Sequence, residues 1–356
     1  MIDRKSLTII DCDGHLLESM EELARYADAG VRMAAVEPRV FFRGPFPTLD
    51  GLHFLNAETA RIIAGGQREY ASSHRPGSAE DWVALLERAG MKDAVLFTSE
   101  GLTVGLLRLT DYTVSLCRAY NDYVADRYRR VSKRLHPMAL IPMLDPKEAA
   151  KELRRAVRDL DLQGAMLPST GLDLDLGHEY YWPVYETAAE LGCTLAVHGG
   201  SNVGLGLNSF NSLFASHVVH HPVALMNACV SIIYRGVFDK WRDLRVAFME
   251  GGCAWTVLLL DRIARDMELM GGPPRTFDDY LTSGQMLVGC EGEDASLPYL
   301  ARRVGIEPFA YSSDYPHEVD YKAAVHEIDE TLESAELTDE DKEAVLGLNA
   351  QRFFRL

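Results

Sequence analysis

The sequence predicts an α/β fold, a (β/α)8 TIM barrel with an excursion inserted after the first helix and extra helices at the C-terminal end. Two observations predict it: short apolar runs alternate with helical patterns, and eight such runs can be counted. This alternation indicates a parallel sheet, and eight repeats are typical of a sheet closed into a barrel. An open, doubly wound sheet is the alternative, but no Gly-x-Gly-x-x-Gly turn follows the first strand. We therefore expect one barrel domain over residues 1–356, with an insertion at about 30–78.

The composition allows a large core and excludes several classes of partner. Of the 356 residues, 47% are hydrophobic. The formal net charge of −17 argues against nucleic acid or an anionic membrane, because both attract basic surfaces. The chain shows no apolar run of about 18 residues, no signal-like segment and no Cys-x-x-Cys pair among its six cysteines. We expect a cytoplasmic protein whose partner is a small molecule.

The first strand is expected at Leu7–Ile10, a short apolar run, and a helix with a capping-box spacing follows it over 19–29. Residues 30–78 then interrupt the pattern with prolines and glycines. Three residues of this excursion could close over an acidic substrate, although solvated loop positions are the simpler interpretation: Arg43, His74 and Arg75.

From residue 79 onward a helical pattern precedes each strand. The expected strands are 93–98, 138–143, 164–167, 193–198, 245–250, 286–289 and 309–314. The expected helices are 79–90, 111–130, 146–159, 180–191, 216–238, 254–269 and 296–303, and two acidic helices, 321–334 and 339–347, close the chain.

Polar residues follow the first strand directly, as Asp11, Asp13 and His15. Side chains two positions apart on an extended chain point to the same side, so Asp13 and His15 can converge on one ion. A carboxylate and an imidazole suit Zn²⁺ or Mn²⁺. The alternative is that the aspartates cap the following helix and that His15 is a surface histidine.

Three more strand ends carry residues that can bind a metal. The fifth strand ends in His198, the sixth in Glu250 and the eighth in Asp314, and a Gly-Gly pair follows both His198 and Glu250. Barrel enzymes place their chemistry at these carboxyl ends, and glycine pairs leave room for a ligand. Four such ends predict a metal site.

Two further histidines are candidates for the same site. His221, preceded by His220 and followed by Pro222, could polarise a substrate or could mark a helix start. His317 lies just after the eighth strand, where it could contact substrate or orient Asp314.

The chain resembles the amidohydrolase superfamily, in the branch that includes aminocarboxymuconate-semialdehyde decarboxylase. The resemblance spans nearly the full length, except for 30–78 and 271–285. The matching pieces are Ile10-Asp-Cys-Asp-Gly-His15, Val197-His-Gly-Gly200, the segments 236–245 and 248–255, Ser312-Ser-Asp-Tyr-Pro-His317 and the ending at 349–354.

The resemblance implies that His15, His198 and Asp314 bind one divalent metal ion, with Asp13 as a further ligand or supporting residue. Asp314 is also the implied catalytic base. We expect Zn²⁺ first and Mn²⁺ second, although an Asp at position 13, where the family has His, shifts the site slightly towards harder ions. A homodimer or larger homo-oligomer is also expected.

The predicted reaction is hydrolysis of a small amide, ester or lactone-like substrate by a metal-activated water. Asp314 would take the proton and a nearby histidine would donate to the leaving group. His221, His317 and Glu250 are the further candidate catalytic residues, and Glu250 or His317 would be the base if Asp314 is not. The alternative is non-oxidative decarboxylation of an aromatic or unsaturated acid. The sixth strand lacks the His-x-Gly-Glu sequence usual in the branch's decarboxylases, which favours hydrolysis. A catalytically silent scaffold is the third possibility, and the four polar strand ends argue against it.

Overall fold

The computed structural model describes residues 4–36, 44–47, 78–210, 212–292, 294–317, 319 and 321–356. Most of the expected insertion, including Arg43, His74 and Arg75, therefore lies outside the described residues, and the single-domain organisation stays a prediction. No helix in these described ranges combines the length and apolarity that a membrane crossing requires.

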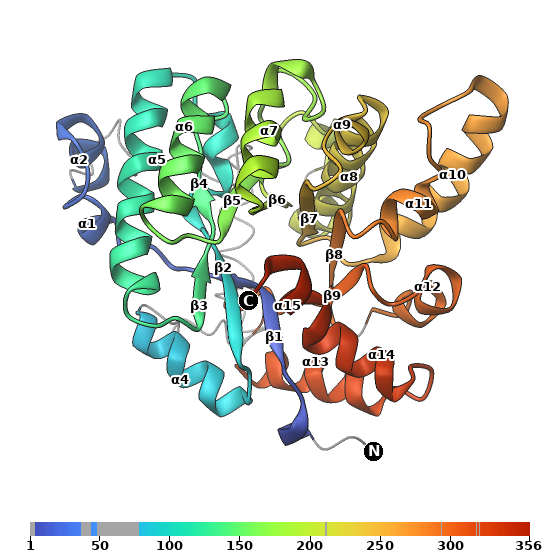
Figure 1. Ribbon diagram of the computed structural model, residues 1–356. Helices are drawn as coiled ribbons and strands as arrows, with labels where there is room; N and C mark the ends of the chain where they lie inside the picture. Colours follow the sequence, from blue (N-terminus) through green and yellow to red (C-terminus); the bar gives the residue numbers. More distant parts are fainter. Residues whose placement is uncertain are drawn as a thin grey trace.

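Parallel strands form the centre of the molecule, and helices surround them (Figure 1). Neighbouring strands pair in the order β1-β2-β3 and β4-β5-β6-β7-β8-β9. The strands are β1 (Ile10–His15), β2 (Asp93–Phe97), β3 (Leu135–Pro137), β4 (Ala139–Leu140), β5 (Gly164–Pro168), β6 (Thr194–His198), β7 (Arg245–Met249), β8 (Met286–Cys290) and β9 (Phe309–Tyr311).

The predicted (β/α)8 fold is confirmed. β3 and β4 share one barrel position because only Met138 separates them, and its N–H donates to Leu96 O of β2 at 2.8 Å. The first strand also meets the segment after β9, since His15 N donates to Tyr315 O at 2.8 Å and Asp314 N to Asp13 O at 2.9 Å. The third strand begins earlier than its predicted start at 138.

The buried polar residue His136 explains that early start. It lies on β3, and its Nε2 is 3.1 Å from Asp93 Oδ1 at the start of β2. An ion-pairing partner on the neighbouring strand therefore satisfies a side chain that the apolar pattern leaves out.

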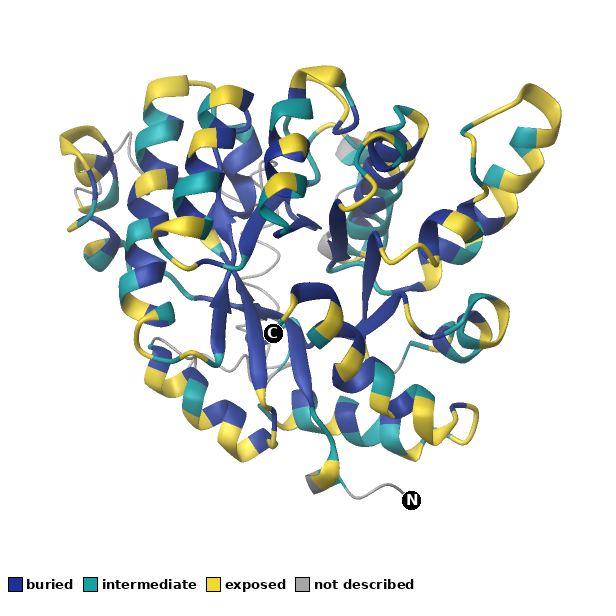
Figure 2. Ribbon diagram, in the orientation of Figure 1, coloured by how far each residue is buried: buried dark blue, intermediate teal, exposed yellow. Residues whose placement is uncertain are grey.

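The helices pack their apolar faces on the strands and turn their exposed faces outward (Figure 2). They are α1 (Met20–Leu23), α2 (Ala29–Val36), α4 (Ala79–Ala89), α5 (Thr110–Val124), α6 (Pro146–Arg158), α7 (Trp182–Leu191), α8 (Leu213–Tyr234), α9 (Val237–Lys240), α10 (Ala254–Met270), α11 (Phe277–Leu281), α12 (Leu297–Val304), α13 (Tyr321–Glu333), α14 (Asp339–Glu343) and α15 (Asn349–Phe354). Short turns of 3-10 or π helix are η1 (Arg4–Ser6), η2 (Glu100–Leu106), η3 (Ala125–Arg129), η4 (Glu179–Tyr181), η5 (Leu207–Ser209) and η6 (Ala344–Leu348).

Two of the predicted helices differ in extent. The helix expected at 19–29 is instead the short α1 followed by α2, which reaches into the predicted excursion. The helix expected at 216–238 starts at Leu213 and ends at Tyr234, because Gly236 adopts the left-handed backbone with φ 74°. His221 and Pro222 therefore lie inside α8, and the helix-start interpretation of His221 is wrong.

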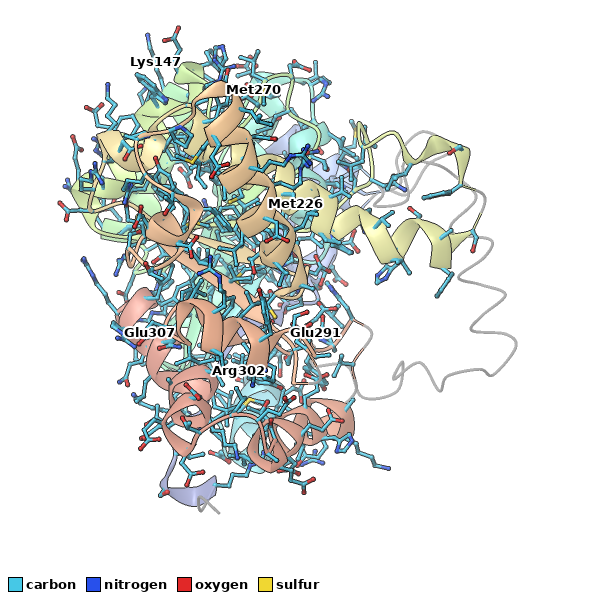
Figure 3. All side chains as sticks on the ribbon, turned by 90° about the vertical axis from the view of Figure 1, so that its right-hand side faces the viewer. Lys147, Met226, Met270, Glu291, Arg302 and Glu307 are labelled. Atoms are coloured by element: carbon cyan, nitrogen blue, oxygen red, sulfur yellow. The ribbon has the colours of Figure 1, made fainter. Side chains whose placement is uncertain are left out.

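The last helix, α15, closes the amino-terminal end of the barrel, where it lies across the centre of Figure 1. Asn349 Nδ2 donates to Ile306 O and Phe309 O, both at 2.8 Å, and Thr194 Oγ1 donates to Phe353 O at 3.3 Å. In Figure 3, Glu307 just before β9 and Glu291 just after β8 lie on opposite sides of the molecule. The carboxyl ends of the strands, which carry the polar residues, lie on the same side of the barrel as Glu291.

Candidate metal centre

The first strand brings Asp13 and His15 together, as their spacing predicts. Both side chains are fully buried, and Asp13 Oδ1 lies 3.6 Å from His15 Nε2. The pairing register with β2 shifts between Asp11 and Gly14. A Cβ at Gly14 would lie 2.5 Å from the Trp82 ring, and Trp82 Nε1 donates to His15 O at 3.2 Å. Glycine therefore lets the tryptophan pack against this irregular part of the strand.

Two histidines present the same ring nitrogen to Asp13. His15 Nδ1 lies 2.9 Å from Thr98 O, and His198 Nδ1 lies 2.8 Å from Gly199 O. A carbonyl can only accept, so each Nδ1 carries a proton for this bond. Burial lowers the pKa of His198, but Asp13 and Glu250 outweigh it and raise the value well above its usual range, so His198 Nε2 also carries a proton while no metal ion is bound. His198 Nε2 lies 2.9 Å from Asp13 Oδ1. Burial lowers the pKa of His15 well below its usual value, and this keeps that ring neutral.

Asp314 approaches His15 from the segment after β9, which pairs with the first strand. Its Oδ1 is 3.3 Å from His15 Nε2. Asp11 fixes this loop by accepting hydrogen bonds from Ser313 Oγ at 2.6 Å and Ser313 N at 3.1 Å. Asp314 itself has a left-handed backbone with φ 51°, a strain that is usually found at functional sites. Burial raises the pKa of Asp314 to about 7, and neighbouring His317 only partly opposes this.

Glu250 also has a left-handed backbone, with φ 61°, and lies beside two imidazoles. Its Oε2 is 3.1 Å from His198 Nδ1 and 3.5 Å from His221 Nδ1. Burial raises the pKa of Glu250, but the histidines outweigh it and hold the value well below the usual range. Burial lowers the pKa of His221 to about 3, so His221 is neutral.

The glycine pair after β6 makes room for these side chains. A Cβ on Gly199 would lie 2.1 Å from His221 Nδ1 and 2.6 Å from Glu250 Oε2. A Cβ on Gly200 would lie 3.0 Å from Leu102 O. The space that we predicted for a ligand at this pair is thus occupied by the protein itself.

His317 is held between Asp314 and the end of β2. Its Nδ1 is 2.9 Å from Asp314 Oδ1, and its Nε2 is 2.8 Å from Ser99 Oγ. Ser99 donates its only hydroxyl proton to Leu16 O at 2.6 Å, so it accepts from His317 Nε2–H. Burial lowers the pKa of His317, but Asp314 and Glu250 outweigh it and raise the value to about 10. His317 is therefore a cation that orients Asp314.

The donor atoms at this site fit one divalent metal ion. Asp13 Oδ2 and His15 Nε2 are buried atoms with no hydrogen-bond partner in the described part of the chain, and Asp314 Oδ1 lies 3.3 Å from His15 Nε2. Ligand atoms that all lie within 4.8 Å of one another form two groups that share His15: Asp13, His15 and His198, and His15, Glu250, Asp314 and His317. Ligands about 2.0–2.2 Å from one ion lie roughly 3.0–3.6 Å apart, close to the separations found here. Buried lone pairs that face one another without a proton are costly, and a cation satisfies them.

The structure therefore brings together all the residues that the sequence predicts for the site: Asp13, His15, His198, His221, Glu250, Asp314 and His317. His220 is next to this group but its Nδ1 faces Ser216 O at 3.1 Å. Sequence reasoning missed Thr98 and Ser99 at the end of β2, and Ser313 before Asp314. The sequence does place hydroxyl pairs at these two strand ends, Thr98-Ser99 and Ser312-Ser313, and these pairs could have indicated the missed residues.

A (β/α)8 barrel with imidazoles and carboxylates converging at the carboxyl ends of its strands defines a class of metal-dependent barrel enzymes. Residues 10–356 match the Amidohydrolase family, and the chain belongs to it.

Two curated relatives are decarboxylases. The 2-amino-3-carboxymuconate-6-semialdehyde decarboxylase of Dictyostelium discoideum is 24% identical over 68% of this chain and 67% of its own length. The gamma-resorcylate decarboxylase of a Polaromonas species is 22% identical over 77% of this chain and 86% of its own. The fold is also that of the 5-carboxyvanillate decarboxylase of Novosphingobium aromaticivorans, whose structure was solved with bound manganese. The TM-score is 0.72 and the identity 19%, over 99% of this chain and 98% of the other.

These relatives overturn the hydrolase prediction, and they support the decarboxylase alternative. The prediction relied on the missing His-x-Gly-Glu sequence at the sixth strand. Imidazoles nevertheless lie beside Glu250, because His198 and His221 approach it from β6 and α8. A local motif could not reveal that arrangement, since its members lie far apart in the sequence.

Proposed function

We propose that this protein is a metal-dependent, non-oxidative decarboxylase of a small aromatic or unsaturated carboxylic acid. The observation that carries the proposal is the position of the Asp314 carboxyl, 3.3 Å from His15 Nε2 and 2.9 Å from His317 Nδ1, next to a set of metal-binding donors. Decarboxylation requires a proton donor that delivers its proton to carbon. The carboxyl group of Asp314, which His317 positions, is placed for that role. The decarboxylase relatives support the same reaction.

Asp13, His15, His198 and Asp314 would hold the metal ion. When bound, a divalent ion supplies a Lewis acid that fixes the substrate's carboxylate or an adjacent hydroxyl and polarises the ring. From the sequence we expect Zn²⁺ ahead of Mn²⁺, and we now reverse that order, because two carboxylates make the donor set harder than an all-histidine site. The manganese in the 5-carboxyvanillate decarboxylase structure supports this order.

The chain's own residues would carry the proton. The bond between the ring carbon and the carboxyl carbon breaks, its electron pair stays on the ring carbon, and CO₂ leaves. Asp314 gives its proton to that carbon, a C–H bond forms, and water restores the proton afterwards. His317, 2.9 Å from Asp314 Oδ1, positions the acid, and Ser99 holds His317. Neutral His221, beside Glu250, is a candidate donor to the substrate's ring hydroxyl.

The test is CO₂ release from candidate acids by the manganese-loaded protein. 2,6-Dihydroxybenzoate and 5-carboxyvanillate, the acids named for relatives and structural neighbours, are the first substrates to use. We expect one CO₂ for each molecule of decarboxylated product. A parallel panel of amides, esters and lactones is the control. Turnover in that panel, with no CO₂ from any acid, would contradict the proposal.

A further inference from the structure

A second cavity lies at the opposite end of the barrel from the metal centre, where β7, β8 and β9 begin. It encloses about 420 Å³, within the range of roughly 300–1,000 Å³ that is typical of small-molecule sites. Glu307 lines it, and Figure 3 shows this residue on the side away from Glu291. The cavity is therefore distinct from the metal centre.

Arginines are the main charged residues of this cavity. They are Arg245 on β7, Arg352 on α15 and Arg355 directly after α15. Among the residues that the structure describes, none of the three forms an ion pair with a carboxylate. What distinguishes these three arginines is that they line the same cavity. Unpaired guanidinium groups that face one cavity indicate an anion site.

Arg245 is the most informative of the three because it is only 8% exposed. One Nη donates to Gly192 O, and the buried Nε has no hydrogen-bond partner in the described ranges. Burial and then the charge of Arg355 lower the pKa of Arg245 to about 10. A buried cation without a counter-charge is costly, and an anion in the cavity would remove that cost.

The two other arginines line the cavity from α15 and from the residue directly after it. Arg355 Nη1 donates to Gly192 O at 3.1 Å, the same carbonyl that Arg245 contacts. Arg352 Nη2 donates to Asn349 Oδ1 at 2.7 Å, which fixes its direction. Both are exposed and keep other donors available to a ligand.

The charge of the cavity distinguishes between anions. Three arginines and one glutamate leave a formal charge of about +2, which matches a phosphate dianion better than a monocarboxylate. Guanidinium forks also match the oxygen geometry of phosphate. The volume leaves space beyond a phosphate ion, and Met286 and Phe353 are apolar residues of the lining; the centre of the Phe353 ring lies 5.9 Å from the Arg245 guanidinium carbon.

We propose that this cavity binds the phosphoryl group of a small phosphorylated metabolite, remote from the metal centre. The site does not depend on the reaction catalysed at the other end of the barrel, so either proposal can fail alone. Inorganic phosphate shares the same chemistry and is the simplest probe.

The test is calorimetric titration of the full chain with inorganic phosphate, glucose 6-phosphate and benzoate at constant ionic strength. Arg352→Gln and Arg355→Gln are exposed substitutions that should leave the fold intact. Each should weaken phosphate binding by about tenfold or more, because each removes charge-assisted hydrogen bonds. Arg302→Gln is the matched control, since Arg302 is an exposed arginine of α12 that pairs with Glu336 at 3.7 Å, and it should bind like the wild type.

Melting temperature gives a second readout that is independent of activity. Phosphate should raise it in the wild type and in Arg302→Gln, and much less in the two cavity variants. Tighter binding of glucose 6-phosphate than of phosphate supports a metabolite, and equal binding supports the phosphoryl group alone. Phosphate binding that neither cavity variant weakens would overturn the proposal. Benzoate binding as tight as phosphate binding, with the same sensitivity to the variants, would also overturn it.

Discussion

The Asp314→Asn substitution separates metal binding from proton transfer. Asparagine keeps the size of the side chain and an oxygen that can face His15 Nε2, now 3.3 Å from Asp314 Oδ1. It has no proton to give at neutral pH. Asp13, His15 and His198 remain in place as donors. We expect near-normal metal content and a fall in turnover of about 10²–10⁴-fold, which corresponds to about 2.7–5.5 kcal/mol in the barrier.

The assay measures metal content and CO₂ release on the same preparation. Asp161→Asn is the matched control, because Asp161 is exposed, has a similar left-handed backbone with φ 59° and lies before β5, at the other end of the barrel. Its activity and metal content should match the wild type. Full metal with near-normal turnover in Asp314→Asn would refute the assignment of Asp314 as the acid. Loss of metal together with activity would refute the separation of the two roles.

Three further substitutions test the surroundings of the site. Ser99→Ala removes the hydroxyl that accepts from His317 Nε2, and it should lower kcat about tenfold with little change in KM. Ser99→Thr keeps a hydroxyl and should have the wild-type kcat. An unchanged kcat in Ser99→Ala would argue against this positioning role. Gly199→Ala would place a Cβ 2.1 Å from His221 Nδ1. It should lower the free energy of unfolding by about 1–3 kcal/mol, measured by urea titration, and it should also lower turnover. Wild-type values for both quantities would contradict the packing argument. Burial raises the pKa of Glu18 from 4.5 to about 7 in the folded state, so its protonated form favours folding below pH 4.5 and that contribution is lost as the pH rises through 7. Relative to Glu18→Gln, the wild type should lose about 3 kcal/mol of unfolding free energy over that window, and parallel pH profiles would refute the shift.

The barrel could be predicted from the sequence because its strands are short apolar runs that helical patterns separate. The prediction was less accurate where a tertiary partner satisfies a polar residue, as Asp93 does for His136 on β3. It was also less accurate where one glycine ends a helix, as Gly236 does after α8. Such effects depend on neighbours in space and leave little trace in local periodicity.

The candidate site could be predicted because its residues stand at strand ends, which the fold brings together. Glu250 and His221 could be identified as candidates, but not their contact, since α8 carries the histidine to the strand end. Ser99 was missed because a serine after a strand is common and gains its role only through His317. The reaction was mispredicted because a short missing motif was weighed without the arrangement in space.

The most direct test of the proposed chemistry is the reaction of the manganese-loaded protein in D₂O. A substrate that releases CO₂ must gain one hydrogen at the ring carbon that loses the carboxyl group, and this hydrogen comes from an acid that exchanges with solvent. Mass spectrometry and NMR of the product should therefore show one deuterium at that carbon for each CO₂ released. A product that keeps all its carbon atoms and instead takes up oxygen from labelled water would contradict decarboxylation.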